Sequence, residues 1–256
     1  MFETLLTEAD GAIGQLSLNQ PDKRNPLSTT VLTELAAAAR WFDEQAEVKV
    51  VIVRGVGRVF SSGADLSTFD GSLEISPKEA WDGGREMADA LENMRAVSIA
   101  AIHGWCIGGG IVLAASCDLR VAAENARFSL PEVDVGIPLG WGGIPRLVRE
   151  IGPALTKELV LTCRPFDARE AKAAGFLNRT VPEDELEASV HALAQSLASK
   201  ASHTLVSTKR HVNAVTDQMV GTMRSWSDSD GFVTALADAE CTAARRKYLR
   251  AHRRGN

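Results

Sequence analysis

Cysteine pairs and long apolar runs are missing from this sequence, and each absence excludes a class of protein. The cysteines show no Cys-x-x-Cys pair and no histidine at metal-ligand spacing, which argues against a disulfide framework or a zinc site; they are Cys106, Cys117, Cys163 and Cys241. No uninterrupted apolar stretch is long enough to cross a bilayer. The first residues, MFETLLTEADG, lack the basic start and apolar run of a signal peptide. We therefore expect free thiols, no bound metal, no membrane association and a cytoplasmic location.

An excess of positive charge is also missing. The formal net charge of −5 argues against general nucleic-acid binding, which usually needs a basic surface. Basic residues gather only near the end of the chain, where they are either a solvated helix end or a phosphate contact; they are Arg245, Arg246, Lys247, Arg250, Arg253 and Arg254. With 45% hydrophobic and 24% charged residues, the composition is that of an ordinary globular protein.

The order of periodic segments predicts an α/β fold with a helical C-terminal part. An Asp10-Gly11 turn signal ahead of alternating apolar residues indicates a β-hairpin, and a helix with a Ser28 cap should follow. A buried strand is expected at residues 48–53 because this run is rich in β-branched residues, and two further buried strands are expected at 97–102 and 119–122. Asp167 and Glu170 form a capping-box-like pair at the start of an expected short helix, and beyond Pro182 the apolar spacing is helical. Strands first and helices last is the pattern of an α/β core followed by helices.

Two segments rich in small residues could bring backbone N–H groups to a ligand. The first, Val59–Leu66, reads VFSSGADL, and the second, Ala101–Gly110, ends in three glycines at the start of an expected helix. A phosphate loop would need Gly-Lys-Ser/Thr, and a dinucleotide site would need Gly-x-Gly-x-x-Gly; neither is present. The remaining possibility is an anion site without lysine, suited to a developing oxyanion.

A third segment, Phe128–Pro138, places Glu132 in an otherwise apolar stretch after a proline. Burial there would raise the pKa of its carboxyl group towards the range useful for proton transfer. A structural, capped glutamate is the alternative, and the spacing alone favours that alternative. The stretch that follows, Gly140–Leu147, reads GWGGIPRL.

In this order and spacing, the three segments resemble the crotonase, or enoyl-CoA hydratase/isomerase, superfamily, from about Gly11 to the tail. The resemblance implies a spiral of ββα units over residues 1–195 and a C-terminal helical region over 196–256 that builds trimers, often paired into hexamers. It also implies an acyl-CoA thioester as substrate, with coenzyme A present only as part of that substrate.

The resemblance assigns roles residue by residue. Ala64 and Gly109 match the two backbone N–H donors of an oxyanion hole, and Glu132 matches one of the two catalytic glutamates of the hydratases. The family's backbone holds coenzyme A at the positions of Ser62, Asp65 and Leu66.

Three further residues are assigned to substrate binding. Arg24 lies near the family's nucleotide site, and Trp141 is expected to shape the acyl pocket. Tyr248 belongs to the helix that can reach the nucleotide of a neighbouring subunit.

One departure from the family pattern decides between reactions. The hydratases place their other glutamate two residues after the glycine triplet, where this chain has Val112. Moving a double bond from position 3 to position 2 needs only one base, whereas holding and activating water uses two carboxyl groups. Glu79, Glu86 or Asp134 could in principle supply a missing acid. Gly140 stands where the dienoyl isomerases and some hydrolases of the family carry an acid.

The sequence therefore predicts an enzyme of the enoyl-CoA hydratase/isomerase group with Glu132 as the single acid/base and isomerisation favoured over hydration. The alternatives are another single-base reaction of the family, such as decarboxylation or hydrolysis of an acyl-CoA, and a non-catalytic acyl-CoA-binding protein. No metal or redox cofactor is implied, because the thioester itself acidifies the α-carbon.

Overall fold

The computed structural model describes residues 2–65, 76–225 and 228–253. Its strands are β1 (Leu5–Asp10), β2 (Ile13–Leu18), β3 (Pro26–Leu27), β4 (Val50–Gly55), β5 (Gly63–Ala64), β6 (Val97–Ile102), β7 (Trp105–Ile107), β8 (Leu119–Ala123), β9 (Arg127–Ser129), β10 (Phe166–Asp167) and β11 (Arg179–Val181). Its α-helices are α1 (Thr29–Glu44), α2 (Pro77–Asn93), α3 (Gly109–Ala115), α4 (Glu132–Val135), α5 (Gly143–Thr162), α6 (Ala168–Ala173), α7 (Leu186–Ala198), α8 (Ser202–Val220), α9 (Asp228–Ala237) and α10 (Ala239–Arg253). Short 3₁₀ turns lie at Pro21–Lys23, Glu183–Glu185 and Thr222–Ser225.

A six-stranded sheet in the order β1-β2-β4-β6-β8-β11 forms the centre of the molecule. The hairpin of β1 and β2 is antiparallel and turns at Gly11, whose φ is +54°, and the remaining neighbours pair in parallel. This confirms the expected hairpin, the α/β class and the three buried strands; the strand expected at residues 48–53 begins two residues later, at Val50.

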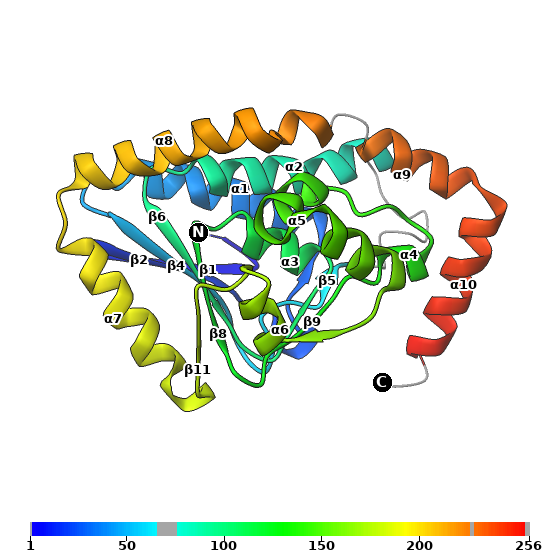
Figure 1. Ribbon diagram of the computed structural model, residues 1–256, viewed down its shortest axis with the longest axis horizontal. Helices are drawn as coiled ribbons and strands as arrows, with labels where there is room; N and C mark the ends of the chain where they lie inside the picture. The colour runs from blue at the N-terminus through cyan, green and yellow to red at the C-terminus, as the bar shows by residue number, and fades with distance from the viewer. Residues whose placement is uncertain (1, 66–75, 226–227, 254–256) are drawn as a thin grey trace.

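Both faces of the sheet are covered, as a parallel sheet requires. Alternate residues of β4 enter different clusters: Val51 and Val53 pack under α1 and α2, whereas Val50 and Ile52 pack against α7. Figure 1 shows α1, α2 and α8 along one side of the sheet and α7 on the other. The period-2 alternation of a strand therefore explains why the whole run is apolar.

Several elements begin at the capping signals of the sequence. The Ser28 side chain accepts a hydrogen bond from the Val31 N–H, 3.4 Å away, at the start of α1. The Asp167 carboxylate accepts from the Glu170 N–H at 2.8 Å at the start of α6. Each cap satisfies an N–H that the first helical turn leaves without a partner, so the expected helix starts are confirmed.

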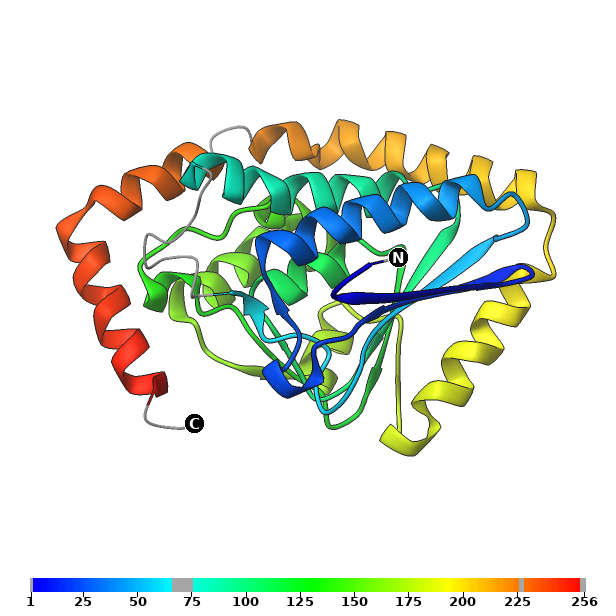
Figure 2. The ribbon, with the colours of Figure 1, turned by 180° about the vertical axis from the view of Figure 1, so that it is seen from behind.

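Short strands that the sequence did not predict connect the main sheet to the cavity. β3 pairs with β5, β9 lies between β10 and β7, and a single bridge joins Ser61 to Cys106. These pairings bring the start of α3, the β5 turn and α4 to one place. Figure 2 shows α10 at the opposite end of the molecule from α7.

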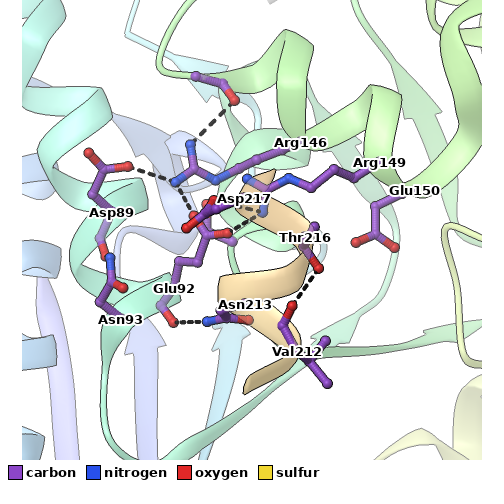
Figure 3. A network of polar contacts seen from close by, with 12 residues as sticks. Asp89, Glu92, Asn93, Arg146, Arg149, Glu150, Val212, Asn213, Thr216 and Asp217 are labelled. Atoms are coloured by element: carbon purple, nitrogen blue, oxygen red, sulfur yellow. Dashed lines mark hydrogen bonds and ion pairs between the residues drawn. The ribbon is translucent and has the colours of Figure 1, made fainter. Parts of the chain in front are cut away.

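An ion network fixes α2 against α5 and α8 (Figure 3). Arg146 is 1% exposed, and its Nη2 donates to Asp89 at 2.8 Å and to Glu92 at 2.5 Å. Arg149 shares the Glu92 carboxylate at 2.7 Å, and Asn213 donates to the Glu92 carbonyl at 3.2 Å. Because Trp81 lies on α2 and Trp141 precedes α5, this network holds two walls of the cavity relative to each other.

The C-terminal helices leave apolar side chains on the surface. Along α8, Val212, Val215 and Met219 are 57%, 47% and 73% exposed. They recur at helical spacing and so form one stripe. The predicted trimerisation through this region and the division of the chain at residue 196 both stay predictions. None of the described helices has the length and apolarity needed to cross a membrane.

Candidate active site

A cavity of about 840 Å³ opens between the β5 turn, the start of α3, α4 and α10. It brings together eight residues that the sequence assigned to the site, and they come from six separate parts of the chain: Arg24, Ser62, Ala64, Asp65, Gly109, Glu132, Trp141 and Tyr248. Leu66, which was also assigned to the site, lies outside the described residues.

The β5 turn and the start of α3 touch along their backbones. Gly63 has a φ of +84°, and a Cβ there would lie 2.6 Å from the Ile107 carbonyl oxygen and 3.6 Å from the Gly109 nitrogen. The neighbouring N–H groups are engaged: Gly63 donates to the Ser61 hydroxyl at 3.1 Å, and Asp65 donates to the Leu27 carbonyl at 3.2 Å. Ala64 lies between them. Because successive N–H groups of a strand point in opposite directions, and the Asp65 N–H points to β3, the Ala64 N–H points away from β3.

The glycine triplet begins α3 beside that turn. Gly108 has a φ of +50°, and its N–H donates to the Ser129 carbonyl at 2.8 Å. The Gly108 carbonyl accepts from the Ile111 N–H at 2.8 Å, so Gly109 is the first helical residue. The first N–H groups of a helix have no acceptor within it. The backbone geometry is therefore suited to presenting the Gly109 N–H to the cavity.

Glu132 is the first residue of α4 and is 7% exposed. Its Oε2 is buried and makes no hydrogen bond to any described residue, and its Oε1 lies so close to Gly108 that a Cβ there would clash with it. Burial raises the pKa of the carboxyl group to about 7, against a small lowering effect of its own backbone. A carboxyl group with this pKa can both accept and return a proton near neutral pH.

Val112 occupies the position of the family's other glutamate and is 1% exposed. It lines the cavity, and its Cγ2 would lie 2.8 Å from a Cβ on Gly143. The side chains proposed as substitute acids lie elsewhere. Glu86 and Asp134 are exposed, and Glu79 forms a capping box with Ser76. Among the described residues, none of those three carboxylates lines the cavity.

Two tryptophans line the cavity beside Gly109. A Cβ on Gly109 would clash with Cζ3 of Trp141, and the Trp141 ring is 5.6 Å from that of Trp81. Trp141 has a φ of +60°, an unusual conformation for a bulky residue, and Arg146 Nη1 donates to its carbonyl at 3.3 Å. Trp81 was not predicted as a site residue, because the sequence pattern predicted no helix at α2.

Ser62, Arg24 and Asp65 line the cavity near the 3₁₀ turn at Pro21–Lys23. The Ser62 N–H donates to the Arg24 carbonyl at 3.0 Å. Asn25, a buried residue that the sequence analysis did not select, holds this turn by donating to the carbonyls of Val56 and Val59 at 2.9 and 3.0 Å. Its place next to Arg24, before Pro26, was the available signal.

Tyr248 lines the cavity of its own chain, together with Glu132. Burial raises the pKa of its phenol, and the negative charge of Glu132 raises it further. The predicted contact of this helix with the nucleotide of a neighbouring subunit stays a prediction.

Comparison with known proteins agrees with this architecture. Residues 8–252 match the family model described as enoyl-CoA hydratase/isomerase. The chain is 34% identical over 217 residues to the Mycobacterium tuberculosis protein named "Probable enoyl-CoA hydratase echA8", covering 83% of this chain and 82% of that one. It is 32% identical over 213 residues to the short-chain-enoyl-CoA hydratase of Clostridium acetobutylicum, with 83% and 82% covered.

Among solved structures, an enoyl-CoA hydratase from Mycobacterium avium subsp. paratuberculosis superposes with a TM-score of 0.86 at 27% identity, covering 95% of this chain and 98% of that chain. The crotonase-like α/β fold with C-terminal helices is therefore confirmed. The chain belongs to the enoyl-CoA hydratase/isomerase family of the crotonase superfamily.

Proposed function

We propose that this enzyme isomerises 3-enoyl-CoA to 2-enoyl-CoA thioesters in preference to hydrating 2-enoyl-CoA, with Glu132 as its single acid/base. The Glu132 carboxylate takes a proton from C2, and the electron pair of that C–H bond moves into the thioester to form an enolate. When the enolate collapses, the C3–C4 double bond shifts to C2–C3, and Glu132 returns its proton to C4. The atoms balance without water or another reactant.

The Ala64 and Gly109 N–H groups would stabilise the enolate oxygen. The contact of the β5 turn with the start of α3 supports this pairing, because it brings two backbone segments to the same wall of the cavity. Removing one donor of an oxyanion hole typically costs about a hundredfold or more in rate. No metal or redox group enters the scheme, since the thioester acidifies the C2 proton.

The observation that carries the preference for isomerisation is the environment of Glu132. It is a buried carboxyl group with a raised pKa, and the side chain at the position of a second carboxylate is Val112. A single group that both takes and returns a proton suits the shuttle from C2 to C4. The relatives described above are named hydratases, and a direct comparison of the two reactions distinguishes the alternatives.

The remaining parts of the proposal concern binding and assembly. Arg24, Ser62 and Asp65 would contact coenzyme A, and Trp141 the acyl group. The exposed apolar stripe of α8 supports assembly into a trimer or a hexamer.

The deciding experiment measures turnover of 3-enoyl-CoA, 2-enoyl-CoA and malonyl-type CoA thioesters by the same preparation. We expect isomerisation of the 3-enoyl thioester to be fastest. Faster hydration would overturn the preference, and turnover of the malonyl-type thioester alone would favour the decarboxylation alternative. If saturating acyl-CoA raises the melting temperature but no thioester turns over, the protein is a binder.

A further inference from the structure

The C-terminal helix α10 is held against α4 of its own chain. Arg245 is 8% exposed, and its Nη2 donates to the carbonyls of Gly136 at 3.5 Å and Ala235 at 3.2 Å. Gly136 ends α4 with a φ of +75°, and the backbone of Cys241 lies so close to it that a Cβ on Gly136 would clash. These contacts place the Cys241 and Arg245 turns of α10 directly on the turn after Glu132.

The same face of α10 carries Tyr248. Positions 241, 245 and 248 are spaced by four and three residues, so their side chains lie along one side of a helix. Tyr248 is half-buried, packs against the main hydrophobic core and lines the cavity together with Glu132 and Ala251. The phenol is therefore a wall of the cavity next to α4.

The negative charge of Glu132 acts on the Tyr248 phenol. The Glu132 carboxylate, Asp134 and Cys163 all disfavour ionisation of the phenol, after the larger effect of burial. The hydroxyl group thus stays protonated at neutral pH. A neutral phenol oxygen can accept a hydrogen bond from water while its own hydrogen is donated elsewhere.

Water that attacks C3 of a 2-enoyl thioester must direct a lone pair at that carbon. Two hydrogen-bond acceptors, one for each water hydrogen, fix this orientation. Glu132 can be one of them, but the Val112 side chain cannot be the other. We infer that Tyr248 accepts one hydrogen of the attacking water and Glu132 accepts the other, so that the enzyme hydrates 2-enoyl-CoA as its slower second reaction. This inference rests on the proposed roles of Glu132 and the oxyanion donors.

The step balances without a change in Tyr248. As the water oxygen bonds to C3, its proton passes to Glu132, and the π electrons of the C2–C3 bond move to the thioester oxygen. Glu132 then gives that proton to C2 as the enolate collapses. The shuttle from C2 to C4 involves no water, so isomerisation does not need the phenol.

The test is Tyr248→Phe, which removes the hydroxyl and keeps the ring that packs on the core. We expect hydration of 2-enoyl-CoA to fall at least about tenfold in kcat, the loss for one charge-neutral hydrogen bond worth about 1.4 kcal/mol in the transition state. Isomerisation of 3-enoyl-CoA should fall by a smaller factor, because it orients no water, so the ratio of hydration to isomerisation should fall. This ratio is the readout, because both reactions use the same cavity, oxyanion donors and base.

Other outcomes separate this inference from the proposed function. Unchanged hydration in Tyr248→Phe would refute the role of Tyr248, because the hydroxyl would then have no effect on that reaction. An equal fall in both reactions would also refute it, because Tyr248 would then be a general packing or binding residue. A wild-type enzyme that isomerises but never hydrates would also refute it and leave the proposed function intact. Loss of both reactions in Glu132→Gln, with a selective loss in Tyr248→Phe, would support both.

Discussion

Replacing Glu132 by glutamine tests the proposed chemistry and the electrostatics of the site together. The amide is nearly isosteric with the carboxyl group, so packing should persist, but it neither accepts nor returns a proton. General acid–base catalysis contributes about 10²–10⁴-fold to rate, and we expect Glu132→Gln to lose at least about 100-fold in kcat for every reaction of the enzyme. Full activity in this variant would show that another acid does the work.

The same variant has a predictable effect on stability. Raising the pKa of Glu132 from 4.5 to about 7 corresponds to roughly 3 kcal/mol against its ionised form. The folded state then binds the proton more tightly than the unfolded state, so wild-type stability falls as pH rises from about 4.5 through 7. Glutamine has no such titration. As the pH is raised from 5 to 8, the free energy of unfolding of Glu132→Gln should therefore increase by roughly 2–3 kcal/mol relative to that of the wild type.

Thermal unfolding at both pH values measures this gain. For a chain of 256 residues it corresponds to a relative rise in melting temperature on the order of 5–10 °C at pH 8. Mass spectrometry of the variant excludes deamidation back to glutamate, which would restore some activity. If the difference in melting temperature between the two proteins is the same at pH 5 and pH 8, the pKa of Glu132 is not raised on folding. That result would contradict the burial of its carboxyl group in the structure.

Three further predictions test other parts of the site. Because Glu132 must begin the reaction ionised, kcat/KM for isomerisation should rise with pH with a midpoint near 7, and a flat profile between pH 5 and 8 would contradict the assignment. Arg146→Met should lower the free energy of unfolding by about 1–3 kcal/mol in a urea titration, because Asp89 loses its partner and Glu92 keeps only Arg149. Loss of the more exposed Arg164–Glu158 pair should cost less than about 1 kcal/mol in the same titration. Light scattering at micromolar concentration should give three times the 27.4 kDa chain mass or a multiple of that value, and a monomer would contradict the trimer.

Local signals in the sequence predicted the helices, strands and turns that are specified by a few neighbouring residues. Ser28 and Asp167 cap helices, Gly11 makes a turn, and the β-branched run at Val50 can form a strand that is buried on both faces. Because these signals act over a few residues, they can be recognised without knowledge of the rest of the fold. The ordered motifs then placed eight of the nine assigned site residues in one cavity.

Features that depend on contacts between distant segments could not be predicted in the same way. The strands β3 and β5 contain two residues each, too few for any period to appear. Trp81 lines the cavity because α2 is held by α1, by the stacking of Trp81 on Phe232 and by the ion pairs of Arg146, and these segments are far apart in the sequence. Tyr248 likewise lines the cavity together with Glu132 because α10 packs on Gly136. No local pattern encodes such pairings.

Val112 has a consequence beyond the loss of a proton carrier. Two carboxyl groups in one buried site titrate as a coupled pair, with macroscopic pKa values that belong to neither group. With valine at that position, burial is the largest cause of the raised pKa of Glu132, and Tyr248 stays neutral in the same range. The site should then show a single ionisation near neutral pH. A lone base with a pKa near the working pH can both take a proton and return it. A shuttle between C2 and C4 requires both steps.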